Sequence, residues 1–265
     1  MPLVRCFSTL GCPDLLIDDV FALAERHGIE ALELRALGGT IDLAEHFAQQ
    51  FGTPEKLAAQ VRGRSAGVVA INTSLHLVGA TAAEWAQAEA LAPWAEALGV
   101  RWMRAFDGGA DASNAEIAEA KATLEAWSSL RASRGWKVEL MVETHDSLFT
   151  SAAIGRLVAA VPDVRILWDS HHTWKRGGED PVATWRAIKA QVVHIHVKDS
   201  VSRPSGRHPY TYVLPGAGEF PMVELREVLA KEFSAAVSLE WEKLWHPELQ
   251  PLEAALRATA ERGWW

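Results

Sequence analysis

The stretch Val193–Asp199, which reads Val-His-Ile-His-Val-Lys-Asp, decides the fold of this 265-residue chain. Side chains alternate between the two faces of a strand, so His194, His196 and Lys198 share one face and the valines and the isoleucine take the other. In a helix-covered barrel the apolar face packs outward, so the polar set faces the lumen. We therefore expect His196 near the barrel mouth, His194 one layer deeper as a hydrogen-bonded core histidine, and Lys198 on the rim.

The same chain alternates short β-branched runs with Ala-, Leu- and Glu-rich stretches from end to end. The predicted strands are Val4–Phe7, Ala31–Arg35, Gly67–Thr73, Trp102–Ala105, Lys137–Glu143, Arg165–Asp169, Val192–Lys198 and Ala236–Glu240. The predicted helices are Leu15–His27, Leu43–Gly63 (broken at Pro54), Ala82–Leu98, Asn114–Gly135, Ser151–Ala160, Val182–Ala190, Met222–Lys231 and Pro251–Arg262. Eight strands, each followed by a helix, predict one (β/α)₈ barrel domain over residues 1–265. The alternative, an open doubly wound sheet, lacks its Gly-rich turn after the first strand.

The amino-acid composition of the chain argues against several classes of protein. Asp and Glu total 34 against 26 Lys and Arg, a formal net charge of −8, which argues against general nucleic-acid binding. The two cysteines, Cys6 and Cys12, form no disulfide framework, and no apolar run is long enough to span a membrane. These features predict a cytoplasmic protein without nucleic-acid or membrane partners.

Four consecutive predicted strands run apolar and then end in an acid or an imidazole. Glu143, Asp169, His196 and Glu240 stand at matching heights near the carboxyl ends of these strands. Carboxyl ends of barrel strands meet at one mouth, so the four side chains are expected to converge on one divalent cation. Three carboxylates and one imidazole favour Mn²⁺ or Mg²⁺, with Co²⁺ and Zn²⁺ as alternatives.

The spacing of the two glutamates suggests a mechanism. Strands five and eight lie three steps apart around the ring, roughly 135° by division of the circle. Glu143 and Glu240 would therefore reach a metal-bound substrate from separate sides, one removing a carbon-bound proton and the other returning it. A metal chelated by a hydroxyl and a carbonyl stabilises the enediolate formed in between. Epimerisation and aldose–ketose isomerisation are the two outcomes.

These motifs resemble the sugar phosphate isomerase/epimerase family of xylose-isomerase-like barrels, which includes endonuclease IV. The matching segments are Val142–Asp146, Trp168–His172, His194–Asp199, Pro215–Glu219 and Ser238–Glu242. The likeness runs from about Lys137 to Pro247, and a weaker one covers Ile29–Arg35. The resemblance implies metal-ligand places for the same four residues and a substrate-contacting place for His172.

Two departures from family patterns restrict the substrate. Ketohexose 3-epimerases of the family carry a second glutamate six residues after the strand-five ligand, where this chain has Phe149. Endonuclease IV carries an Asp-x-His after strand seven, and none follows Asp199. The resemblance therefore argues against both a ketohexose epimerase and an abasic-site nuclease.

Further polar residues near the predicted mouth are candidate substrate contacts. They are His172, Lys198, Arg35, Arg104 and His145. Arg35 and Arg104 end strands two and four, where they either grip a carboxylate or phosphate or form rim salt bridges. Lys198 either polarises a substrate carbonyl or pairs with Asp199 or Glu240.

Three functions remain open from the sequence. The first is an isomerase or epimerase acting on a sugar, sugar phosphate or keto-polyol. The second is a lyase that dehydrates a keto-cyclitol or a dehydroshikimate-like acid, since it needs the same metal and base. The third is a catalytically silent sugar-binding accessory protein, whose sign would be a broken ligand set. The partner in each case is a sugar-like small molecule, with a homo-oligomer as a further possibility.

Overall fold

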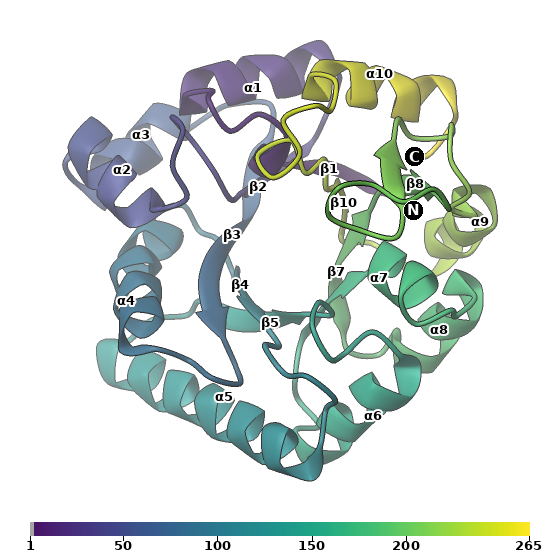
Figure 1. Ribbon diagram of the computed structural model, residues 1–265. Coiled ribbons are helices and arrows are strands. Elements are labelled where there is room, and N and C mark those ends of the chain that lie inside the picture. The colour runs from purple at the N-terminus through teal and green to yellow at the C-terminus, as the bar shows by residue number, and fades with distance from the viewer. Residues whose placement is uncertain (1–2) are drawn as a thin grey trace.

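The computed structural model describes residues 3–265 and contains a closed ring of eight parallel strands with helices around its outside (Figure 1). The ring strands are β1 (Val4–Ser8), β2 (Ala31–Leu34), β3 (Gly67–His76), β4 (Trp102–Phe106), β5 (Glu139–Glu143), β6 (Ile166–Asp169), β7 (Val192–Val197) and β10 (Ala236–Leu239). Neighbours around the ring follow chain order, and β10 closes it against β1. The predicted (β/α)₈ barrel is confirmed.

The helices form the outer layer of the barrel (Figure 1). They are α1 (Ile17–Arg26), α2 (Leu43–Phe51), α3 (Pro54–Val61), α4 (Ala82–Ala97), α5 (Asn114–Arg134), α6 (Ser151–Ala160), α7 (Ser170–Lys175), α8 (Pro181–Ile188), α9 (Met222–Glu232) and α10 (Leu252–Glu261). The predicted break at Pro54 is confirmed: the proline opens α3, where its missing N–H costs nothing. Within residues 3–265 no helix is long and apolar enough to cross a membrane.

Two features beside the barrel mouth were not predicted: the helix α7 and a two-stranded antiparallel sheet. Asp169 ends β6 and caps α7 by accepting a hydrogen bond from the backbone N–H of His172 (2.9 Å). After β7 the chain forms an antiparallel pair, β8 (Asp199–Val201) with β9 (Thr211–Val213). Both elements come from loops that follow strand carboxyl ends, which is where barrels of this class build their sites.

The interior divides into an apolar layer and a polar layer. Apolar side chains from the strands and helices form the main core between the two shells. Inside the ring, small groups such as Cys6, Ala31 and Ala236 fill one layer of the lumen. Toward the carboxyl ends of the strands the lumen becomes polar, and Ser238, His196 and Asp169 stand in register on adjacent strands. The polar layer is the floor of the site.

Candidate metal centre

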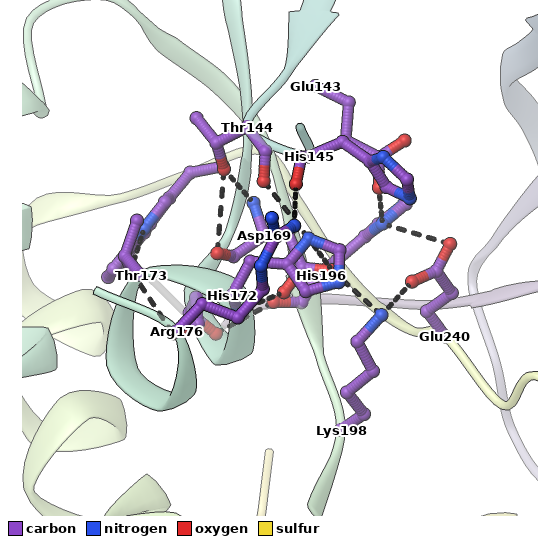
Figure 2. Close-up of polar contacts among 12 residues, drawn as sticks. Glu143, Thr144, His145, Asp169, His172, Thr173, Arg176, His196, Lys198 and Glu240 are labelled. Atoms are coloured by element: carbon purple, nitrogen blue, oxygen red, sulfur yellow. Dashed lines mark hydrogen bonds and ion pairs between the residues drawn. The ribbon is translucent and has the colours of Figure 1, made fainter. Parts of the chain in front are cut away.

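Four strand ends bring their acids and an imidazole to one point in the barrel mouth. Glu143 comes from β5, Asp169 from β6, His196 from β7, and Glu240 directly follows β10. One ligand atom from each lies within 4.8 Å of the others, and all four side chains are buried. Figure 2 shows them directed toward one another. The structure therefore brings together the set singled out from the sequence.

The imidazole of His196 is oriented by a carboxylate below it. Its Nε2 donates to Glu33, at 2.9 and 3.0 Å from the two carboxylate oxygens. Among residues 3–265 its Nδ1 has no hydrogen-bond partner, and it faces Glu143 Oε1 (3.4 Å) and Glu240 Oε1 (3.3 Å). Placing the proton on Nε2 leaves the Nδ1 lone pair free, the arrangement that metal-binding histidines adopt with a supporting carboxylate.

The donor set fits a divalent cation. Burying a carboxylate away from water costs several kcal/mol unless a positive group compensates it, and three carboxylates meet here. Burial raises the pKa of Asp169 to about 6, although the Lys198 ammonium acts in the opposite direction. A cation between the four groups would satisfy the free Nδ1 of His196 and the crowded carboxylate oxygens together.

Lys198 departs from its predicted place on the rim. Its side chain is only 1% exposed, and its Nζ lies 2.8 Å from Asp169, 2.5 Å from Glu240 and 2.6 Å from Glu242. Burial lowers its pKa, but these acids outweigh burial and raise the pKa well above the usual value. The prediction of a rim position was wrong because three carboxylates compensate a buried ammonium. Of its two predicted partners, Glu240 is paired with it.

Asp199, the other predicted partner of Lys198, instead organises a loop. Its carboxylate accepts backbone N–H groups of Ser200, Gly216, Gly218 and Phe220 at 2.9–3.0 Å. A Cβ at position 218 would collide with this carboxylate, so the glycine is needed there. The loop amides are thereby occupied by an acid of the chain itself.

Two histidines stand beside the ligands. His172 is buried, and its Nδ1 donates to the carbonyl of Thr144 (3.0 Å) while lying 3.3 Å from Asp169 Oδ2 (Figure 2). His145 is 38% exposed, packs edge-on against His172, and pairs with Asp146 at 2.9 Å. Burial alone would lower the pKa of His145, but the hydrogen bond to Asp146 and the nearby acids raise it to about 9.

The two arginines predicted as anion contacts are buried in the lumen. Arg35 follows β2 and is 4% exposed, and Arg104 in β4 is 2% exposed. Arg35 Nη2 donates to Ser74 (3.2 Å), and Arg104 Nε lies 3.2 Å from Glu143 Oε2. Neither is a rim residue, so the alternative of rim salt bridges does not hold.

Sequence reasoning missed Glu33, which joins a second cluster below the first. Its carboxylate accepts from His194 Nε2 (2.7 Å), from Asn72 Nδ2 (2.6 Å) and from His196. The prediction of His194 as a hydrogen-bonded core histidine is confirmed. The signal was present in the sequence: an acid between Leu32 and Leu34 in an apolar strand alternates into the lumen.

A sequence profile of a known family covers nearly the whole chain. The xylose isomerase-like TIM barrel profile matches residues 21–262. The chain belongs to this family. The predicted resemblance is confirmed at that level, and members of the family include isomerases, epimerases and dehydratases. No curated protein sequence matches the chain.

Solved structures of the same barrel show the range of the family. A probable 3-DHS dehydratase, AsbF of Bacillus anthracis, involved in petrobactin synthesis, superposes with a TM-score of 0.78 at 21% identity, covering 99% of this chain and 100% of that chain. The IOLI protein with a bound zinc atom gives 0.72 at 19% identity, covering 98% and 96%. The 3-keto-D-glucoside 4-epimerase YcjR of E. coli gives 0.67 at 12% identity, covering 98% and 99%. At these identities the similarity establishes the fold of the xylose isomerase-like barrel alone.

Proposed function

We propose that the chain is a divalent-metal-dependent isomerase or epimerase that moves a carbon-bound proton of a sugar, sugar phosphate or keto-polyol. The observation that carries this proposal is the free Nδ1 of His196 among three buried carboxylates. Glu143, Asp169, His196 and Glu240 would hold the cation. A bound divalent cation would stabilise the negative charge that develops on substrate oxygens when a proton leaves the adjacent carbon. Mn²⁺ and Mg²⁺ are favoured by the oxygen-rich set, and Zn²⁺ and Co²⁺ are alternatives.

Glu143 and Glu240 are the proposed acid/base pair. Each directs one oxygen toward His196 Nδ1, and the other oxygen lies beside a cation: Arg104 for Glu143 and Lys198 for Glu240. The cations favour the ionised form of each glutamate, the form that accepts a proton. The two acids come from strands separated by β6 and β7, so they approach a substrate from different sides.

The remaining polar residues at the mouth would orient the substrate. Lys198 supports this role because its ammonium lies within hydrogen-bond distance of the acids that surround the cluster. His172 and His145 border the same space, and the partly exposed His145 stands nearest to solvent. Arg35 and Arg104 lie buried in the same lumen, at the end of β2 and in β4.

A lyase that dehydrates a keto-cyclitol or a dehydroshikimate-like acid is the second candidate. The observation that favours it is the pair of buried guanidinium groups, which suits an acidic substrate better than a neutral sugar. The third candidate, a silent sugar-binding protein, has less support, because no member of the ligand set is replaced or directed away from the cluster.

The test is proton exchange with a substrate panel. Manganese-loaded protein would be incubated in D₂O with ketoses, aldoses and inososes, and the products followed by NMR. Deuterium at carbon supports the isomerase or epimerase, whereas loss of water supports the lyase. Binding without either reaction in all cases would overturn both in favour of the third candidate.

Matched variants locate the chemistry. Glu143→Gln should abolish exchange, because it removes a proposed base and a metal ligand. Glu139→Gln makes the same change at the other end of β5, where the side chain pairs with Arg101 near the surface. Exchange should survive in Glu139→Gln, and equal loss in both variants would contradict the proposed site.

A further inference from the structure

Two buried arginines in the lumen keep hydrogen-bond donors without a partner among the described residues. Arg35 Nη1 and Arg104 Nη1 are buried and make no hydrogen bond there, whereas Arg104 Nε faces Glu143 Oε2 at 3.2 Å. The guanidinium of Arg104 lies 3.6 Å above the ring of Phe106, which holds its plane in place. These donors face inward from β4 and from the end of β2, beside the proposed metal centre.

Such an arrangement is costly unless a partner satisfies the free donors. Burying a charged group costs several kcal/mol unless its donors are paired, and two like charges repel in addition. Burial and the neighbouring Arg104 lower the pKa of Arg35 to about 9, although the carboxylates of Glu143, Glu240 and Glu33 act in the opposite direction. Glu143 is in ion-pair contact with Arg104, whereas Glu240 pairs with Lys198 and Glu33 with the two histidines. Among residues 3–265 no acid is in ion-pair contact with Arg35, so its free donor is available to a ligand.

We propose that Arg35 and Arg104 form an anion subsite, and that the substrate of this enzyme carries a carboxylate group. The proposal rests on the proposed function, because it places the carboxylate in the same lumen as the metal centre. A guanidinium presents paired N–H donors in a plane, which matches the two oxygens of a carboxylate. The free donors on the two arginines would then be satisfied by one planar group.

Charge favours a carboxylate over a phosphate. A phosphate monoester carries about −1.5 to −2 at neutral pH, whereas a carboxylate brings a single negative charge. It would also bring excess negative charge toward Glu143, which already contacts Arg104. Phosphates are often held by loop amides at the mouth of such barrels. Here the amides of Gly216 and Gly218 already donate to Asp199.

The test compares ligands that differ in one group. Manganese-loaded full-length protein would be titrated by calorimetry with glucose, glucuronate and glucose 6-phosphate, and separately with myo-inositol and quinate. In at least one set the carboxylate should bind at least about tenfold more tightly than its neutral partner, about 1.4 kcal/mol. Equal binding within both sets, no carboxylate binding in either, or tighter binding of the phosphate overturns the subsite.

An arginine variant tests whether Arg35 makes the difference. Arg35→Gln should weaken binding of the carboxylate at least about tenfold more than binding of the neutral ligand, about 1.4 kcal/mol, while the protein still binds manganese. A merely structural role would weaken all ligands alike, which also overturns the subsite. The matched control is Arg101→Gln. The guanidinium of Arg101 is exposed and lies beside Glu139 and Trp102.

Manganese binding and exchange separate the two proposals. A protein that binds manganese and exchanges protons of neutral sugars without preferring carboxylates overturns the subsite alone. A protein that binds no manganese overturns the proposed function, whatever the ligand preference.

Discussion

The acidic residues at the strand ends of this barrel lie in two kinds of environment. Asp107, after β4, accepts the backbone N–H groups of residues 145–148 and the hydroxyl of Ser147, at 2.6–3.1 Å. Asp199, after β7, likewise accepts four backbone N–H groups. Glu143 and Glu240 have side-chain cations and each other as neighbours instead. Acids with saturated oxygens hold loops, and acids with free oxygens are available for ligands.

The largest expected effect is a loss of proton exchange when an acid of the proposed metal centre is changed. Glu240→Gln should slow deuterium exchange of the substrate found in the panel by about 10³-fold, the scale of losing a general base. The amide cannot accept a proton and is a poorer metal ligand. The measurement is exchange rate by NMR at saturating manganese. A rate within a few-fold of the wild type would mean that Glu240 is no base.

For an acid that holds a loop, we expect a loss of stability with little loss of manganese binding. Asp107→Asn puts an NH₂ group against backbone N–H donors, so the free energy of unfolding should fall by about 2–4 kcal/mol. Urea denaturation followed by circular dichroism measures it. Manganese affinity should change by less than about tenfold. A larger loss of manganese affinity than of stability would break the distinction.

Glu33 lies between the two kinds, because it is buried and saturated but acts on a ligand. Glu33→Gln should weaken manganese binding by about 10- to 100-fold, since the amide no longer accepts from both histidines. Calorimetry gives the affinity. Ser238→Ala is the control, because the Ser238 hydroxyl is buried in the same lumen beside the Cys6 thiol. Equal effects of the two changes would remove Glu33 from this role.

The smallest expected effect is thermal. Manganese at ten times its dissociation constant should stabilise the folded protein by about 1.4 kcal/mol. For a chain of this size this corresponds to a rise in melting temperature of about 3–6 °C. Asp107→Asn should keep this rise and Glu240→Gln should reduce it. A chelator should reverse it, as scanning calorimetry would show.

The eight strands and the break at Pro54 could be predicted because they depend on local pattern. The convergence of Glu143, Asp169, His196 and Glu240 could be anticipated, since barrel geometry sends every strand end to one mouth. Their roles in binding and catalysis stay predictions. The position of Lys198 could not be predicted, because burial of an ammonium depends on acids from other strands.

The environments of Asp107 and Asp199 could not be predicted from the sequence either. Asp107 and Asp199 follow strands as Glu143 does, and nothing in the local pattern distinguishes their partners. Apart from the N–H of Ser200, their backbone partners lie in loops 17 to 41 residues away. The hairpin of β8 and β9 was not predicted either, because its strands are only three residues long.

The ion pairs of Lys198 have a kinetic consequence. Lys198 pairs with Asp169 and Glu240, and Tyr212 in β9 donates to Glu242 (2.8 Å), which in turn pairs with Lys198. A cation at the proposed centre would share Asp169 and Glu240 with this ammonium, so its release would require the contacts of Lys198 to rearrange. Exchange of one metal for another should therefore take far longer than diffusion.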